Sequence, residues 1–411
     1  MKEENLQKYC ELILRTGVNL HKGQCLAISF SPANSEFAVK LAESAYKLGA
    51  KFVELMASSN SLKKNRIMYS EKADDLNFVP DFVKARIFEY VTNEWAYIRI
   101  DNLEEIDELR NVDADKMGIM LKAEQEANMS MSNAISKGKI AWCIVAAPGP
   151  KWAAKVFGKD SSDELTDKLS DNLIKILRLD KKDTVKEWND LSEKLIQRAK
   201  ILTGMKLDKL IFKGPGTDLE IGLNGNSFWL GGGAKAQNGR TFLPNIPTEE
   251  VFTTPDYRRT NGKVKVTKPV KVLENLLTGI WFEFKDGKIT DFGSDTNREL
   301  LEMFFNTDEG AKYLGEVALV DKNSEVHKSG LIFNSILYDE NAACHIALGR
   351  GFPTCFTNKD ELNTPEEMKL NGCNYSLVHT DFMIGSDEIN VTGVTQDGKE
   401  VVIIKDGEFK I

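Results

Sequence analysis

The sequence lacks any apolar run long enough to cross a membrane. Its longest continuous apolar run lies near Ile140–Ala147, whereas a membrane-spanning helix needs about 20 apolar residues. The first residues, MKEENLQKYC, also lack the charged and then apolar pattern of a secretory signal peptide. We therefore expect a cytoplasmic protein without a membrane partner.

An excess of basic residues is missing too. The 54 lysines and arginines are outnumbered by 62 acidic residues, which gives a net charge of −8. Nucleic-acid-binding domains carry basic patches that neutralise phosphates, so we expect no nucleic-acid partner. An acidic balance instead attracts cations.

The six cysteines include no CxxC pair, which argues against a thiolate zinc site. We expect free, buried thiols at residues 10, 25, 143, 344, 355 and 373. Cys344 stands beside His345 and could be a thiolate ligand or a nucleophile. In the helix that we expect there, neighbouring side chains point about 100° apart, so a packing role for Cys344 is favoured.

The first half of the chain alternates strand and helix patterns, which is typical of a mostly parallel sheet covered by helices. The sequence predicts a helix at Ser35–Leu48 and strands at Cys25–Phe30, Phe52–Ala57, Ala96–Asp101 and Ile140–Ala147. No glycine fingerprint for nucleotides follows these strands. We predict an α/β domain over residues 1–204 with a structural, cavity-covering role.

Two amphipathic helices are predicted at Glu164–Leu179 and Thr184–Leu202, and the sequence pattern changes after them. Short strands bounded by Asn-Gly and Asp-Gly turns then predict an α+β, mainly antiparallel domain over residues 205–411. These strands are Lys209–Lys213, Asp218–Leu223, Lys263–Thr267, Gly279–Phe284 and Gly398–Lys405. The glycine-rich stretch Leu230–Gly239 lacks the GK[ST] ending of a phosphate loop, so we expect a mobile or close-packed loop.

The stretch Tyr338–Gly351, YDENAACHIALGRG, places carboxylates and an imidazole beside small residues. Its composition predicts a short helix from Ala342 to Leu348 that ends at Gly349 and contains His345. Glu340 would then lie at or before the first turn. Two interpretations are open: a solvated cap with a hydrogen-bonded core histidine, or a metal site.

Other segments place carboxylates in apolar surroundings. Glu316 interrupts the apolar strand GEVALV, and Glu250 lies in NIPTEEVFTTP, where its strand neighbour Glu249 points the opposite way. His379 and Asp381 lie two residues apart and share one face of a strand. A lone strand glutamate is usually an edge residue or half of a salt bridge, but a buried unpaired carboxylate costs several kcal/mol, so a bound cation is the competing explanation.

These segments together offer oxygen and nitrogen donors without a thiolate: Glu250, Glu316, Glu340, His345, His379 and Asp381. Four carboxylates balance the charge of two divalent ions. A shared carboxylate can hold two such ions about 3.5–4 Å apart with a bridging hydroxide as the nucleophile.

The segments NIPTEEVFTTPD, TDEGAKYLGEVALV, DENAACHIALGRG and HTDFMIG, in this order, resemble the aminopeptidase T family of metallopeptidases. The resemblance extends to KYCELILRTGVNLHKGQ and PGPKWAAKVF, and so covers the chain. It implies a two-domain enzyme, usually a homodimer, with two Zn²⁺, Co²⁺ or similar ions in the carboxy-terminal domain. The implied activity is hydrolysis of amino-terminal residues from peptide substrates.

Carried over motif by motif, the resemblance implies five metal ligands. Glu316 and Asp381 are the candidates for bridging both ions, and His379 matches an active-site histidine that is either a ligand or a supporting donor. A general-base role for Glu249 would need irregular backbone. The ligands are Glu250, Glu316, Glu340, His345 and Asp381.

One position departs from the family pattern. Phe352 aligns with the catalytic tyrosine, whose hydroxyl would donate to the oxyanion, and losing such a donor costs roughly 100- to 1000-fold in rate. Tyr257, Tyr338 and Tyr375 lie in neighbouring motifs and could substitute. The alternative function is therefore a catalytically weakened, metal-containing homologue that binds peptides.

Overall fold

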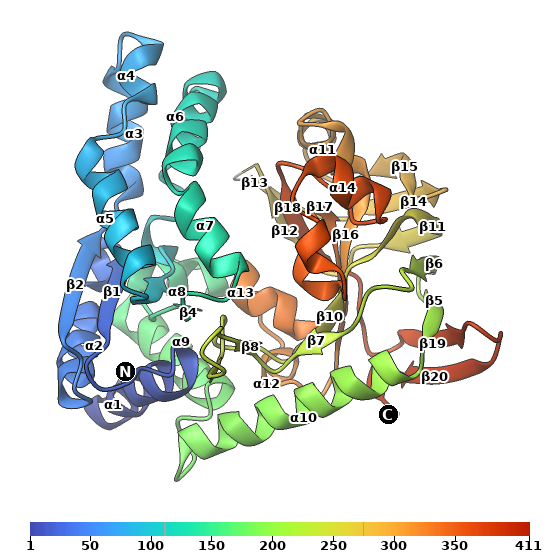
Figure 1. The fold of residues 1–411 in the computed structure, drawn as a ribbon, viewed down its shortest axis with the longest axis horizontal. Coiled ribbons are helices and arrows are strands. Elements are labelled where there is room, and N and C mark those ends of the chain that lie inside the picture. The colour runs from blue at the N-terminus through green and yellow to red at the C-terminus, as the bar shows by residue number, and fades with distance from the viewer. Residues whose placement is uncertain (111, 274) are drawn as a thin grey trace. The chain divides into compact units, whose positions relative to one another are not determined.

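The structure, a computed structural model, describes residues 1–110, 112–273 and 275–411 (Figure 1). The chain forms two compact units. The first comprises Met1–Asn189 and Gly233–Pro247, and the second comprises Asp190–Gly232 and Thr248–Ile411. The chain leaves the first unit within helix α10, Thr184–Gly204. The assignment of a structural role to residues 1–204 and a catalytic role to residues 205–411 stays a prediction.

The first unit contains the predicted parallel sheet. Its strand order is β2-β1-β3-β4, and every neighbouring pair is parallel. The strands are β1 Cys25–Phe30, β2 Phe52–Ala57, β3 Ala96–Ile100 and β4 Trp142–Val145. Helix α2, Ser35–Lys47, connects β1 to β2 and buries Phe37 and Leu41. The α/β prediction for this half is confirmed.

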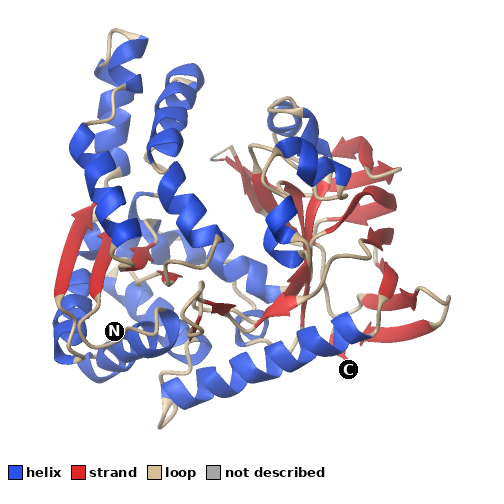
Figure 2. Ribbon diagram, viewed as in Figure 1, coloured by secondary structure: helices blue, strands red, loops and turns tan. Residues whose placement is uncertain are grey.

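Helices predominate in the rest of the first unit, as Figure 2 shows in blue. Helix α9 begins at Asp163 because the side chain of Ser162 accepts a hydrogen bond from the backbone of Leu165, an N-cap. Helix α9 spans Asp163–Ile176, and the unit also contains α1 Glu3–Leu12, α3 Asn60–Tyr69, α4 Ala73–Asn77, α5 Asp81–Thr92, α6 Ala114–Ala127, α7 Met129–Ser136 and α8 Pro150–Phe157. Two short strands, β8 Ala234–Lys235 and β9 Thr241–Phe242, pair with each other.

The second unit is mainly antiparallel, as predicted. An eight-stranded sheet has the order β15-β14-β11-β6-β5-β19-β20-β21. Its strands are β5 Leu207–Gly214, β6 Thr217–Leu223, β11 Pro255–Lys265, β14 Trp281–Lys285, β15 Lys288–Gly293, β19 Asn390–Thr395, β20 Glu400–Lys405 and β21 Glu408–Phe409. Strand β12, Val270–Val272, pairs with β13, Asn275–Leu277. The described helices of the unit, besides the end of α10, are α11 Arg298–Phe305, α12 Glu325–Lys328, α13 Ile336–Asp339 and α14 Pro365–Leu370.

A five-stranded sheet of the second unit has the order β18-β17-β16-β10-β7. Its strands are β7 Leu230–Gly231, β10 Glu250–Thr253, β16 Leu314–Val320, β17 His345–Gly349 and β18 His379–Met383. All neighbouring pairs are antiparallel. A Cβ atom on Gly231 would lie only 2.8 Å from the Glu250 carbonyl oxygen, so this glycine of the Leu230–Gly239 stretch is close-packed.

The predicted helix from Ala342 to Leu348 is wrong. Helix α13 ends at Asp339, a single 3₁₀ turn covers Glu340–Ala342, and residues from His345 onward form β17. The small residues favour a helix locally, but β17 pairs with β16 on one side and β18 on the other, and Ile346 and Leu348 enter the core. Tertiary pairing overrides the local propensity here.

The cysteines are all free, and five of them are buried. Cys25 is partly exposed, so the expectation of burial is wrong for this residue. Cys344 lies in the turn before β17 rather than in a helix, and burial raises the pKa of its thiol to about 12. It is therefore a packing thiol. Among the described residues, no helix combines the length and apolar character that crossing a bilayer requires.

Candidate metal centre

Neighbouring strands of the five-stranded sheet carry the predicted donors. Ala347 of β17 pairs with Glu316 of β16 on one side and with Asp381 of β18 on the other. Because side chains on paired residues point to the same face of a sheet, the small Ala347 leaves the two carboxylates facing a common space. His379 shares this face with Asp381, as predicted from their spacing of two.

The donor atoms form two groups that share one residue. Glu250, Glu316 and His345 make one group, and Glu316, His379 and Asp381 make the other, with the donor atoms of each group within 4.8 Å of one another. Glu316 belongs to both groups, and its side chain is only 6% exposed. The structure thus brings together donors from four strands that are far apart in the sequence.

Glu340 belongs to neither group. It begins the 3₁₀ turn before β17 and is buried. Burial raises the pKa of its carboxyl well above the ordinary value, and the negative charges of Glu250 and Asp381 raise this pKa further. Glu340 therefore interacts electrostatically with both donor groups. Below, Glu340 and the five residues of the two groups are called the acidic cluster.

The cluster strongly perturbs the titration of its members. Burial, together with the charges of Asp381 and Glu250, raises the pKa of Glu316 to about 7. Burial alone would lower the pKa of His345, but the nearby negative charge of Glu250 raises it to about 10. Burial would raise the pKa of Asp381, but the neighbouring His379 lowers it. Such opposed shifts within one small volume are typical of functional sites.

Both imidazoles are oriented by backbone carbonyl groups. His345 Nδ1 donates to the carbonyl oxygen of Ala343 at 3.1 Å, and His379 Nδ1 donates to that of Arg350 at 2.7 Å. The Nε2 atoms then face the carboxylates: that of His345 lies 3.1 Å from Glu250, and that of His379 lies 3.3 Å from Glu316. This arrangement fixes the tautomer of a metal-binding histidine.

Two buried carboxylate oxygens test whether the cluster suits a cation. Glu250 Oε2 and Asp381 Oδ1 accept no hydrogen bond from any residue that the structure describes, although imidazole nitrogens lie 3.1 and 3.5 Å away. Buried unsatisfied carboxylate oxygens are costly. A divalent cation would satisfy both, and the mixed carboxylate and imidazole donors without thiolate suit such an ion. The residues therefore fit a metal centre.

Phe352 lies beside the cluster. Its ring centroid is 4.9 Å from that of His379 and 5.8 Å from that of Phe252, and its backbone N–H donates to Thr254 Oγ1. The ring carries no hydroxyl that could donate a hydrogen bond there.

The three tyrosines considered as substitutes have other neighbours. Tyr257 packs edge-on against Tyr313, and Tyr375 lies under the guanidinium of Arg350. Tyr338 is fully buried and packs on Phe333.

Glu249 makes hydrogen bonds through both its carboxylate and its backbone. Its carboxylate accepts the N–H of Glu325 at 3.3 Å, and its own N–H donates to Asn341 Oδ1. Sequence reasoning missed Asn341, as well as the two carbonyl groups that orient the imidazoles. The only signal for Asn341 was an amide within the DENAACH segment.

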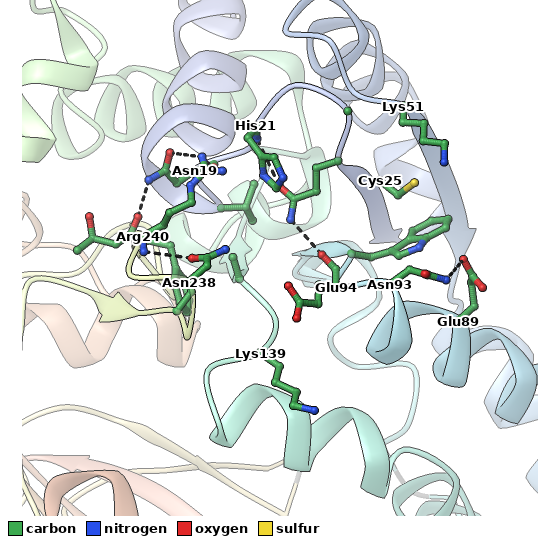
Figure 3. A pocket seen from close by; sticks show the side chains of 18 residues that line it. Asn19, His21, Cys25, Lys51, Glu89, Asn93, Glu94, Lys139, Asn238 and Arg240 are labelled. Carbon is green, nitrogen blue, oxygen red and sulfur yellow. Dashed lines mark hydrogen bonds between the residues drawn. The ribbon is translucent and has the colours of Figure 1, made fainter.

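A recess of about 370 Å³ in the first unit has a different character (Figure 3). Residues that directly precede its parallel strands line it, including Gln24, Lys51, Trp95 and Ala141. It therefore lies at the amino ends of the strands, whereas ligands of open α/β sheets bind at the carboxyl ends. Several of its polar groups pair with one another: Gln24 donates to the Glu94 carbonyl, Asn93 to the Glu89 carboxylate and Arg240 to Asn19.

Comparison with known proteins gives matches over almost the whole chain. Residues 2–409 match the model of a family described as thermophilic metalloprotease (M29). The chain is 36% identical over 407 residues to Aminopeptidase 2 of Geobacillus stearothermophilus, covering 99% of this chain and 98% of that one. It is 32% identical to Aminopeptidase T of Thermus thermophilus, covering 100% and 99% of the two chains. The structure of wild-type AmpT from Thermus thermophilus is similar with a TM-score of 0.91 and 31% identity, over 100% of each chain.

Proposed function

The chain belongs to the M29 family of thermophilic metalloproteases and is a metal-dependent aminopeptidase, and on that premise we propose that it acts through two divalent ions held by the acidic cluster. The observation that carries this proposal is the pair of donor groups that share Glu316. Two overlapping groups suit two ions, whereas a single ion would leave one group unsatisfied.

Each donor has a role in this proposal. Glu250, His345 and the nearby Glu340 would hold one ion, His379 and Asp381 would hold the other, and Glu316, which belongs to both donor groups, would serve both. Asp381 is a second bridging candidate, although only one group contains it. The ions are Zn²⁺, Co²⁺ or similar. When bound, they supply a hydroxide nucleophile at neutral pH and polarise the scissile carbonyl group.

The chain's own residues select and orient the substrate. Four clustered carboxylates would offset the positive charge of two divalent ions, so a peptide with a free, cationic α-amine would not be repelled from the loaded site. The carbonyl acceptors of Ala343 and Arg350 hold both Nε2 atoms toward the centre. The substrates are peptides, from which amino-terminal residues are removed.

A second candidate function rests on Phe352. Since its ring lies against His379 and carries no donor, the oxyanion loses a hydrogen bond that a tyrosine at this position would supply. The alternative is therefore a weakened homologue that keeps the metal ions and binds peptides.

One experiment separates these candidates. Purified protein is analysed for metal and assayed on amino acid p-nitroanilides with Co²⁺ or Zn²⁺, with N-acetylated substrates as the control. The leading proposal expects about two ions per chain and turnover of free-amine substrates only. Two ions with peptide binding but negligible turnover would favour the weakened homologue, and at most one ion after saturation would refute the dinuclear centre.

We also propose a cytoplasmic homodimer, from the family resemblance. Light scattering at working concentrations checks the oligomeric state, and a monomer would contradict this part of the proposal.

A further inference from the structure

Asn341 is a completely buried polar residue next to Glu340, with an exposed fraction of 0%. Its Oδ1 accepts the backbone N–H of Glu249 at 2.6 Å. Its Nδ2 donates to the carbonyl oxygen of Leu337 at 2.9 Å and lies 3.5 Å from Glu340 Oε1. One side chain thus contacts both the residue before Glu250 and the carboxylate of Glu340.

These contacts join two segments that the sequence separates widely. Glu249 and Asn341 lie 92 positions apart, and each directly neighbours a carboxylate of the cluster. Glu250 begins strand β10, whereas Glu340 lies in the 3₁₀ turn before β17. No backbone ladder pairs β10 with that turn in the described sheet, whose register runs through β16. The amide of Asn341 is therefore a direct link between the two carboxylate segments.

The turn that carries Asn341 is itself anchored. The carbonyl oxygen of Asn341 accepts the hydroxyl of Ser324 at 2.8 Å, and that of Ala342 accepts His327 Nδ1 at 2.8 Å. Both partners come from the segment around helix α12. Because these hydrogen bonds fix the turn, they also fix the position of the Asn341 amide. The hydrogen bond from the Glu249 N–H to this amide then positions the Glu249 backbone.

We propose that Asn341 is a positioning residue that sets the separation of Glu250 and Glu340, and thereby the affinity of one of the two metal ions. The inference rests on the proposed dinuclear function. The contacts of Asn341 with Glu249 and Glu340 reach the segments that carry Glu250 and Glu340. Loss of Asn341 should therefore weaken one ion selectively, which a general loss of stability would not do.

The test is a Co²⁺ titration of metal-free Asn341→Ala, followed by calorimetry and by the visible spectrum of the bound ion. Residues that orient metal ligands typically contribute about 10- to 100-fold in metal affinity. We expect a loss of this size for one ion and a change below about 3-fold for the other. Glu340→Gln should weaken the same ion, and adding Asn341→Ala to it should cost less than in the wild type, because both act on one site.

Asn374→Ala is the matched control. Asn374 is also buried, at 1% exposure, and its amide donates to the carbonyl groups of Gly310 and Gly349 at 2.8 and 2.6 Å. It should lower the thermal midpoint as Asn341→Ala does while weakening neither ion selectively. If Asn341→Ala does not fold, Asn341→Ser, which leaves a smaller void and a hydroxyl, takes its place.

The outcomes separate the two levels of the proposal. Equal weakening of both ions, or unchanged affinity for both in a folded variant, would overturn the role of Asn341 while leaving the metal centre intact. Failure of the wild type to bind two Co²⁺ ions would instead overturn the dinuclear function.

Discussion

Two buried carboxylates, one in each unit, show how differently the same burial can be stabilised. Glu104 and Glu316 are 6% and 4% exposed. The Glu104 carboxylate accepts the N–H groups of Lys151 and Trp152 at 3.1 and 2.9 Å. These groups lie in the first turn of helix α8, where unpaired N–H groups and the helix dipole favour a negative charge. Gly149 precedes that turn because a Cβ atom there would overlap the carboxylate.

In the described part of the chain, no helix terminus donates to Glu316. Its neighbours are the carboxylates of Asp381 and Glu250 together with the His379 imidazole, and its pKa is raised to about 7. Protein groups alone thus stabilise the charge of Glu104, whereas the clustered negative charges around Glu316 would be stabilised by bound cations. Burial alone does not identify a metal ligand; the balance of donors and charges around the buried group does.

The largest expected effect comes from removing the shared carboxylate. Glu316→Gln should lose both ions and all measurable peptidase activity, because the bridging residue serves both donor groups. Glu340→Gln, outside both groups, should retain at least one ion, and Glu104→Gln should retain both. Elemental analysis after dialysis measures the metal content. Equal losses in Glu316→Gln and Glu340→Gln would count against the bridging role.

The second prediction concerns the missing donor. Phe352→Tyr places a hydroxyl beside His379, where a preorganised donor stabilises the transition state more than the ground state. We expect kcat to rise with little change in KM, and a gain of about 100-fold would equal roughly 2.7 kcal/mol. Phe252→Tyr is the matched control, since it adds the same group to the next ring. A wild type with kcat/KM of about 10⁴ M⁻¹s⁻¹ or more, and an inert Phe352→Tyr, would mean that another group already fills the role.

The third prediction is a pH dependence of stability to which the cluster contributes. The folded pKa of Glu316, about 7, exceeds its ordinary value of 4.5, so the metal-free folded protein holds a proton that the unfolded chain releases. The free energy of unfolding should therefore fall as pH rises from about 4.5 to 7, by up to about 1.4 kcal/mol per proton and pH unit. His345, with its pKa raised from 6.5 to about 10, extends this fall to higher pH.

Metal ions must displace these protons, so their stabilising effect should grow with pH. The increase in thermal midpoint on adding Co²⁺ should be larger at pH 8 than at pH 5.5. Glu104→Gln should show the same trend as the wild type, because Glu104 lies in the other unit. An increase that is independent of pH would contradict the proposed protonation of the metal-free cluster.

The local structure around several cluster residues could be predicted from the sequence. The apolar strand around Glu316 and the spacing of His379 and Asp381 gave correct local structure, since alternation along a strand is a short-range property. The helix expected around His345 failed because partners on β16 and β18 decide that segment. Small residues permit a buried strand as well as a helix.

The sequence did not predict which distant segments pair with one another. Nothing local to Glu316 shows that β17 places Asp381 opposite it through Ala347, and nothing local to His379 shows that the Arg350 carbonyl orients its ring. Glu104 was not singled out at all, because its donors lie 47 and 48 positions later, in α8. The sequence identifies the titratable residues, but the pairing of distant segments decides whether protein donors stabilise a buried carboxylate.

The smallest expected effects are changes in stability. The Glu104→Gln and Glu316→Gln variants are compared in the metal-free and the metal-loaded protein. Glu104→Gln replaces an acceptor oxygen by an NH₂ group facing backbone donors, so it should cost about 1.5 kcal/mol in both forms. Metal-free Glu316→Gln at pH 8 removes a buried charge that Asp381 and Glu250 repel, so it should cost nothing or stabilise slightly. With Co²⁺ present the same variant should be less stable than the wild type, because binding to the folded state no longer contributes. Calorimetric midpoints with and without metal provide the four values. A Glu316→Gln variant that is destabilised equally in both forms would show that protein groups, and not metal ions, stabilise the Glu316 carboxylate, as they do for Glu104.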